Sequence, residues 1–275
     1  MEGGEPSARH VPQSRRHRGG GEAGDANGER REHVSLAIFE PAHPCGFAVR
    51  QSRNVGRNGG DALPEAFEAN PVYAGLDLSA RQDLTALVLV TKDGAGVWHV
   101  RSYFWCPQVG LVDRAKRDRA PYDLWVREGY LEATPGASVD YGYVAERLAE
   151  IAQDCDLRVV AYDRWRIDVM KKALEDRGIA INLQPHGQGF RDMSPALDVL
   201  EAELVSERVR HGDNPVMTWC AANAVATRDA AGNRKLDKGK ATGRIDGVVA
   251  LAMALGAAAS EKKVESEAVP EIVFL

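Results

Sequence analysis

Three aspartates lie at the ends of apolar segments that are far apart in the sequence. Asp77 follows YAGL, Asp163 ends VVAYD, and Asp246 begins DGVVALAMAL. In a fold built on a sheet, these positions would come together at one edge. A carboxylate is costly to remove from water without a compensating positive charge, and three converging carboxylates repel one another. Divalent cations are the usual compensation, so the pattern predicts a metal-dependent site for phosphoryl transfer.

A site of this kind has a defined chemistry. Carboxylates hold two Mg²⁺ or Mn²⁺ ions about 4 Å apart, and the ions clamp the attacking and leaving oxygens of an in-line displacement. Hard cations take oxygen ligands and retain waters, so no histidine or cysteine is required. A metal-bound water would attack, and the second ion would stabilise the departing 3′ oxygen. The predicted activity is that of a nuclease.

Each aspartate also has a structural interpretation. Asp77 could cap a turn, Asp163 could be a helix N-cap, and Asp246 could be a first-turn acid favoured by the helix dipole. Their joint occurrence on one predicted edge favours the metal site. Asp83, in the turn SARQD, is a further candidate ligand, although its interpretation as a turn residue is preferred.

A basic segment over residues 228–244 leads directly into Asp246. It holds six basic and two acidic residues, and its glycines predict a flexible loop that orders on DNA. Three of its lysines are candidates for contacts with DNA phosphates: Lys235, Lys238 and Lys240. His186 and His211 are expected to satisfy local hydrogen bonds rather than to act as acid or base.

The segments around the aspartates predict an α/β fold. Its sheet has five strands, three antiparallel ones followed by parallel ones, and helices flank it. The expected strands cover residues 72–79, 85–92, 97–107, 158–163 and 179–187. Between them, residues 107–138 are expected to be irregular. The expected helices cover residues 140–155, 166–178, 194–212 (with Ser194 as N-cap) and about 244–259.

The chain divides into three parts by composition. Residues 1–70 hold nine arginines, no lysine and many glycines, so they are predicted to be disordered or non-native. Residues 71–260 form the predicted folded domain, and residues 261–275 a flexible tail. A basic arm that contacts DNA is the alternative for the first part, but its ten acidic residues argue against that role.

Charge and cysteine content exclude several classes of protein. With 35 basic and 40 acidic residues the net charge is −5, which excludes a uniformly basic DNA-coating protein. The four cysteines have no CxxC spacing, so reduced and mostly buried thiols are expected. No apolar run is long enough for a membrane span, and no apolar segment follows Arg15 and Arg16, so no export signal is expected. A cytoplasmic location in a bacterial host cell is therefore predicted.

Five segments carry a resemblance to a known family. They are YAGLDLSARQDLTALVLV, YDRW, HGQGFRDMSPALDVLEAEL, HGDNPVMTWCAANAV and RIDGVVALAMAL. In this order, over about residues 71–259, they resemble the nuclease half of a tailed-phage terminase large subunit. The resemblance implies an RNase H-like fold, cleavage of double-stranded viral DNA and metal ligands at Asp77, Asp163 and Asp246. It also implies a portal protein, a small terminase subunit and a capsid precursor as partners.

The chain departs from that family in one respect. An ATPase half with a GxxxxGK[ST] loop normally precedes the nuclease, and these 275 residues hold no such loop. ATP hydrolysis and DNA translocation are therefore not expected. A prophage remnant, a truncated reading frame or a split gene would each explain this departure.

Other classes of protein share parts of this sequence pattern. An inactive prophage remnant without an enzymatic role is one alternative, and an RNase H-like resolvase or transposase is another. The segments MSPAL and NPVMTW favour the terminase. Sugar kinases and actin-like ATPases share the sheet topology, but the chain lacks their second glycine-rich phosphate loop.

Overall fold

A mixed sheet forms the centre of the domain. The computed structural model describes residues 55–79, 84–164 and 167–268. Within these ranges the main sheet has seven strands in the order β4-β3-β2-β1-β5-β6, with β7 also paired to β3. The strands are β1 (Val72–Asp77), β2 (Thr85–Lys92), β3 (Trp98–Pro107), β4 (Glu132–Thr134), β5 (Leu157–Tyr162), β6 (Leu183–Pro185) and β7 (Val209–Arg210).

The strand directions are those expected from the sequence. β1, β2 and β3 are antiparallel neighbours, and β5 and β6 continue the sheet parallel to β1. The predicted mixed α/β sheet is thus confirmed in its five main strands. The sequence did not predict β4 and β7, which add to the edge of β3. Segments of three and two residues are too short to show an alternating pattern.

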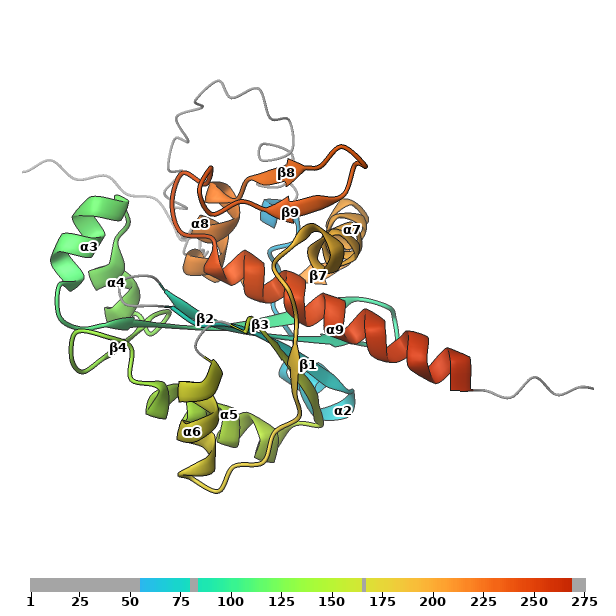
Figure 1. Cartoon of the computed structure of the whole chain (residues 1–275), viewed down its shortest axis with the longest axis horizontal. Helices are drawn as coiled ribbons and strands as arrows, with labels where there is room; N and C mark the ends of the chain where they lie inside the picture. The colour runs from blue at the N-terminus through green and yellow to red at the C-terminus, as the bar shows by residue number, and fades with distance from the viewer. Residues whose placement is uncertain (1–54, 80–83, 165–166, 269–275) are drawn as a thin grey trace, which may run out of the picture. The chain divides into compact units, whose positions relative to one another are not determined.

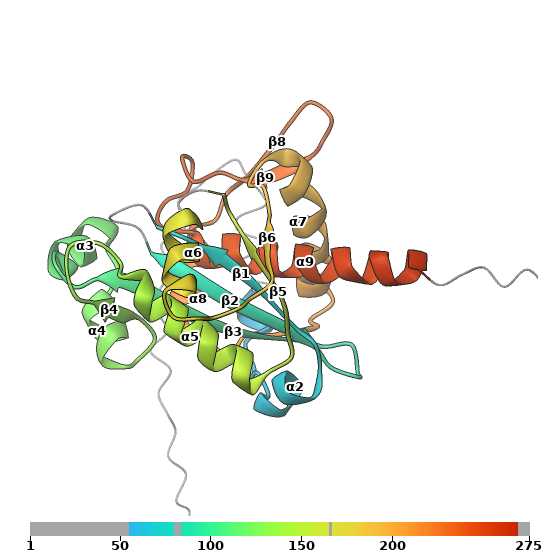
Figure 2. The same cartoon turned by 60° about the horizontal axis from the view of Figure 1, so that its bottom comes forward.

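Helices cover both faces of the sheet (Figures 1 and 2). α5 and α6 pack on one face, and α9 lies across the other, with α7 and α8 packed against α9. A two-stranded hairpin of β8 (Ala226–Arg228) and β9 (Arg234–Leu236) follows α8. The described helices are α2 (Pro64–Ala69), α3 (Leu111–Asp118), α4 (Tyr122–Arg127), α5 (Tyr141–Asp154), α6 (Ile167–Glu175), α7 (Phe190–Val205), α8 (Pro215–Asn223) and α9 (Asp246–Ala268).

Several helices differ from their predicted bounds. α5 lies where expected, and the Asp140 side chain caps it by accepting a hydrogen bond from the backbone N–H of Gly142 at 2.8 Å. α7 instead begins at Phe190, so Ser194 lies inside the helix and is not its cap. It also ends early, because Glu207 turns the chain with φ 53° into β7.

Two regions contain elements that the sequence did not predict. The stretch expected to be irregular contains α3, α4 and β4. The segment NPVMTW starts α8, where the Asn214 side chain accepts from the backbone N–H groups of Val216 and Met217 and Pro215 occupies the first turn. These elements are too short to show a clear periodicity in the sequence.

α9 is buried on nearly all sides, which explains its alanine-rich sequence. Residues 248–258 are buried except Gly256, since the sheet lies below them and α7 and α8 lie above. The helix approaches β1 so closely that a Cβ on Gly75 would overlap the carbonyl oxygen of Ala250. Small side chains at this crossing set the position of α9 on the sheet.

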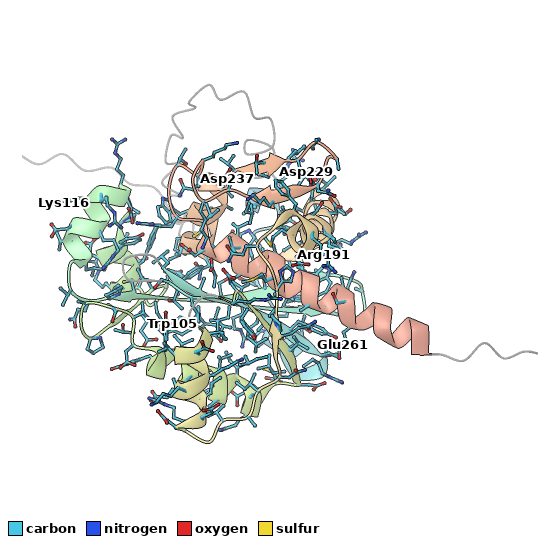
Figure 3. The ribbon with its side chains drawn as sticks, viewed as in Figure 1. Trp105, Lys116, Arg191, Asp229, Asp237 and Glu261 are labelled. Atoms are coloured by element: carbon cyan, nitrogen blue, oxygen red, sulfur yellow. The ribbon has the colours of Figure 1, made fainter. Side chains whose placement is uncertain are left out.

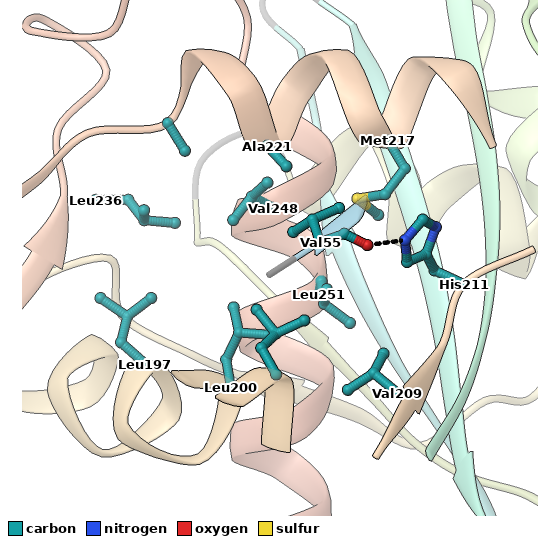
Figure 4. A pocket seen from close by; sticks show the side chains of 12 residues that line it. Val55, Leu197, Leu200, Val209, His211, Met217, Ala221, Leu236, Val248 and Leu251 are labelled. Atoms are coloured by element: carbon teal, nitrogen blue, oxygen red, sulfur yellow. Dashed lines mark hydrogen bonds between the residues drawn. The ribbon is translucent and has the colours of Figure 1, made fainter. Parts of the chain in front are cut away.

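A small apolar cavity remains on the same side of the sheet (Figure 4). It measures about 40 Å³, and its walls come from α7, α8, α9 and the hairpin. The Nε2 of His211 in its wall hydrogen-bonds with the carbonyl oxygen of Val55 at 2.8 Å. Apolar cavities of this size stay dry, so this one carries no chemistry.

The folded part extends further toward the N-terminus than residue 71. Asn58 is buried, donates to the carbonyl oxygen of Leu204 at 2.9 Å and accepts from the N–H of Val209 at 3.0 Å. Phe67 in α2 is also buried. Residues 55–70, placed by composition in the unstructured segment, therefore belong to this fold. The partners of Asn58 lie more than 140 residues away in the chain, which local composition does not reveal.

Within the described part of the chain, no helix is long and apolar enough to cross a membrane.

We expect Gly75→Ala to destabilise the domain by about 2 kcal/mol or more, because α9 must move away from β1 to admit the methyl group. Urea unfolding monitored by circular dichroism measures this loss. Gly94→Ala is the matched control, since a Cβ there meets no atom within 4 Å. Equal stability of the two variants would contradict the packing described for α9.

Candidate active site

Strand register brings two of the predicted aspartates to the same edge of the sheet. Leu76 of β1 pairs with Tyr162 of β5 in parallel, so the next residues, Asp77 and Asp163, follow at the same level. Asp77 shares a strand face with Gly75, the residue over which α9 crosses. Because Asp246 is the first residue of α9, this crossing also brings Asp246 to Asp77.

A lysine bridges Asp77 and Asp246. The Nζ of Lys238 donates to Oδ2 of Asp77 at 2.7 Å and to Oδ1 of Asp246 at 3.0 Å. The two carboxylates are almost completely buried, whereas the lysine side chain is 46% exposed. Lys238 therefore reaches the pair from the solvent side and compensates part of its negative charge.

The electrostatics of this group follow from burial and convergence. Burial raises the pKa of Asp77 to about 7; the ammonium of Lys238 opposes this rise, and the charge of Asp246 adds to it. The charge of Asp163 raises the pKa of Asp77 as well, which places its carboxylate within electrostatic range. Burial favours the neutral form of Lys238, but the two carboxylates outweigh burial and raise its pKa above the ordinary value.

The set of three aspartates is only partly assembled. Among the residues that the structure describes, no three His, Cys, Asp or Glu side chains lie close enough to hold a metal ion together. Asp163 is half-buried beside the bridged pair, and Asp83 lies outside the described residues. The pair itself fits a cation, because Oδ2 of Asp246 is buried and has no hydrogen-bond partner among the described groups.

Gln188 is a site residue that sequence reasoning missed. Its Nε2 donates to Oδ1 of Asp77 at 3.2 Å, from the loop between β6 and α7. Together with Lys238, it leaves each oxygen of the Asp77 carboxylate with a donor. The segment HGQG contributed to the family resemblance, but no spacing rule connects a loop glutamine with a strand aspartate 111 residues away.

The basic segment before Asp246 has a defined conformation in place of the expected flexible loop. β8 and β9 form an antiparallel hairpin, and Asp229 holds its turn through hydrogen bonds from the N–H groups of Ala231 and Asn233. Asp229 and Asp237 both lie on this hairpin side of α9 (Figure 3). Short strands and a side-chain-capped turn replace the flexibility that the glycines indicated.

The three lysines of this segment have different surroundings. The Nζ of Lys235 lies 5.0 Å from the ring centroid of Phe190, and the Nζ of Lys240 donates to the hydroxyl of Thr227 at 3.3 Å. Lys240 is 65% exposed. Lys238 alone of these three contacts the aspartates. The structure thus separates Lys238 from the two lysines that remain candidates for phosphate contacts.

A second ionic cluster ties the loop before Asp246 to the helices beyond β3. The buried Asp118 carboxylate accepts from Nε of Arg244 at 3.3 Å, from Nε of Arg117 at 2.8 Å and from the hydroxyl of Tyr122 at 2.9 Å. Tyr122 packs in an aromatic cluster with Trp125 and Trp219. This cluster positions Arg244, two residues before Asp246.

Among the described residues, no histidine or cysteine hydrogen-bonds with the Asp77–Asp246 pair. Nδ1 of His186 hydrogen-bonds with the carbonyl oxygen of Gly187 at 3.0 Å, and burial lowers the pKa of this histidine. Cys106, Cys155 and Cys220 are free thiols. Burial raises the pKa of Cys106 to about 11 and raises that of Cys220 as well, so both thiols stay protonated.

Comparison with known proteins identifies the family of this α/β domain. Residues 62–262 match the family described as terminase large subunit, endonuclease domain. The chain belongs to this family. The mixed α/β sheet predicted from the sequence is the sheet on which this domain is built.

Individual relatives support this family assignment. The chain is 59% identical to the terminase large subunit of Enterobacteria phage HK97 over 189 residues, which are 69% of this chain and 38% of that protein. It is 32% identical to protein YmfN of Escherichia coli K12 over 205 residues, covering 70% of this chain and 44% of the relative. A crystal structure of the HK97 large terminase superposes with a TM-score of 0.71 at 54% identity, over 75% of this chain and 42% of that one. The chain thus spans less than half the length of these relatives.

We expect Asp118→Asn to destabilise the protein by about 2 kcal/mol at pH 7, because charge-assisted hydrogen bonds are lost. Burial alone would raise the pKa of Asp118, but hydrogen bonds from Arg117 and Tyr122 and the charge of Arg244 hold it below its ordinary value of 3.8. A lowered pKa contributes stability above pH 3.8 that is lost as the pH falls through the folded-state value. The deficit of the variant should therefore shrink below pH 4.

Urea unfolding at pH 7 and at pH 3 measures this dependence. Asp123→Asn, on the exposed side of α4, is the control and should change little at either pH. A deficit of Asp118→Asn that is the same at both pH values would contradict the ionic role of Asp118.

Proposed function

We propose that the chain is the nuclease part of a phage DNA-packaging terminase, and that it cleaves double-stranded DNA by metal-dependent hydrolysis. The observation that carries this proposal is the pair of buried carboxylates, Asp77 and Asp246, in which Oδ2 of Asp246 has no hydrogen-bond partner among the described residues. Asp163, at the end of the neighbouring strand, supplies the third acidic group. Membership of the terminase endonuclease family supports DNA as the substrate.

The aspartates are the groups that would hold Mg²⁺ or Mn²⁺. Two such ions supply an activated water and stabilise the departing oxygen of a phosphodiester. Asp77, Asp246 and Asp163 would supply the carboxylate oxygens that hold the ions. Gln188 holds Oδ1 of Asp77, so it orients that carboxylate for binding. Because both carboxylates are buried, their charge is poorly screened by water and attracts cations strongly.

Further parts of the proposal rest on the family. The portal protein, the small terminase subunit and a capsid precursor are the proposed partners. Since the chain holds no GxxxxGK[ST] loop, we do not expect it to hydrolyse ATP. Release of phosphate from ATP by the purified chain would contradict this expectation.

We expect the full chain to nick a supercoiled plasmid with Mn²⁺ and to lose this activity in EDTA. Asp77→Asn and Asp163→Asn should each lower the nicking rate at least about a hundredfold, because each removes a charged ligand. Gel electrophoresis of the plasmid over time measures the rate.

A matched control lies at the opposite end of the strand that precedes Asp163. Asp156 comes directly before β5, is exposed and pairs with Arg158 at 2.8 Å. Asp156→Asn should keep the wild-type rate. Nicking that persists in EDTA, or that survives Asp77→Asn, would refute the proposed mechanism.

The hairpin lysines are proposed to contact the DNA backbone. Lys235 and Lys240 lie on the segment that leads to the site, and neither contacts the aspartates. We expect the double variant Lys235→Ala, Lys240→Ala to weaken binding to duplexes of unrelated sequence alike. The slope of log K against log salt should decrease by about 2, which corresponds to two lost phosphate contacts.

Fluorescence anisotropy at several salt concentrations, with Ca²⁺ in place of Mn²⁺ to suppress cleavage, measures this slope. The pair Arg158→Ala, Lys171→Ala removes the same charge away from the hairpin, from residues at the start of β5 and in α6, and is the control. An unchanged slope in the hairpin variant would contradict the role of these lysines.

A further inference from the structure

Lys238 stands where a bridging cation would stand. Its ammonium lies 2.7 Å from an oxygen of Asp77 and 3.0 Å from an oxygen of Asp246. Mg²⁺ binds carboxylate oxygens at about 2.0–2.1 Å, so an ion shared by the same two oxygens would compete for the same space. Two positive groups that close together would also repel each other strongly in a buried site. The ammonium and a bridging metal ion therefore exclude one another.

The charge of the pair favours the divalent ion over the lysine. Two carboxylates carry two negative charges when ionised, and a single ammonium compensates one of them. Oδ2 of Asp246 remains buried without a partner among the described groups. A divalent cation would compensate both charges and leave that oxygen available as a further ligand. Lys238 thus holds the two carboxylates together but compensates only one of their two negative charges.

The backbone around Lys238 is held independently of Asp77 and Asp246. The N–H of Asp237 donates to the carbonyl oxygen of Val225 at 2.9 Å. The Asp237 side chain then accepts from the N–H of Gly239 at 3.0 Å and from that of Lys240 at 3.2 Å. The Lys238 side chain is 46% exposed. It can therefore leave the pair by rotating its own bonds toward solvent, while the turn keeps its conformation.

We propose that Lys238 is a resident counter-ion, which holds Asp77 and Asp246 in the metal-free protein and which a divalent cation displaces on binding. This inference rests on the proposed function, since it takes the two aspartates as metal ligands. Displacement returns a positive charge to the solvent side of the site, on the same segment as Lys235 and Lys240. Metal binding thereby adds a cation to the surface proposed to contact DNA phosphates.

Mn²⁺ binding to the full chain, measured by isothermal titration calorimetry without DNA, tests this exchange. In Lys238→Met no ammonium has to be displaced, so we expect Mn²⁺ to bind about tenfold more tightly than in the wild type, or about 1.4 kcal/mol. The same variant should unfold at a lower temperature than the wild type in EDTA, because the carboxylates then repel each other. Saturating Mn²⁺ should close this difference.

Lys240→Met is the matched control for affinity, since it removes one charge from the same turn and Lys240 pairs with Asp237 and Thr227 rather than with Asp77 or Asp246. It should leave Mn²⁺ affinity nearly unchanged. If Lys238→Met does not fold in EDTA, Lys238→Gln, which keeps a donor without the charge, gives the same comparison. Unchanged or weaker Mn²⁺ binding in the Lys238 variant would overturn the proposal, as would equal tightening in Lys240→Met.

The outcome is separable from that of the proposed function. Tighter Mn²⁺ binding in Lys238→Met together with a wild-type chain that does not nick DNA would support the exchange and refute the nuclease. Metal-dependent nicking by the wild type, with equal Mn²⁺ affinity in Lys238→Met, would support the nuclease and refute the exchange. Mn²⁺ that binds neither protein would overturn the exchange.

Discussion

The close crossing of α9 over β1 is the contact on which the rest of the domain depends. Gly75 leaves room for the backbone of Ala250, so a helix lined with alanines lies directly on the central strand. The same contact explains why residues 248–258 of α9 are buried on nearly all sides and why α7 and α8 pack against α9. It also has a chemical consequence. A helix that close to β1 must place its first residue, Asp246, beside the aspartate that ends the strand.

That placement brings two buried negative charges together, and a third segment of the chain supplies the positive charge that compensates them. Two buried carboxylates bridged by one lysine are unfavourable, because burial and the charge of Asp246 both raise the pKa of Asp77. Neither β1 nor α9 supplies a positive group. The compensation comes from Lys238, at a turn whose backbone is held by Asp237. Packing energy from the α9 crossing thus stabilises an arrangement of charges that would not form alone. Because the single charge of Lys238 does not compensate both carboxylates, the site is suited to attract a divalent ion.

The sequence predicted those features that have a local signature. Five strands and the helix after Asp140 showed clear periodicity, and Asp77 stood out because an acid ended a buried strand. Features that depend on distant partners were missed. Asn58 is ordered by Leu204 and Val209, and Gln188 reaches Asp77 from another loop. No local pattern contains such information. The short strands β4 and β7 exist because β3 offers a free edge, which is equally invisible before the sheet is assembled.

The three hairpin lysines show why a charge run alone does not assign roles. In the sequence, Lys235, Lys238 and Lys240 are equivalent members of one basic segment. In the structure, β9 ends between the first two, and the turn at Asp237 aims only Lys238 toward the aspartates. Lys235 lies on the ring of Phe190, and Lys240 is exposed and pairs with Asp237. The difference arises from where a strand stops and which backbone groups its turn satisfies. A single segment can therefore serve both the carboxylates and the proposed DNA surface, with roles separated by one turn.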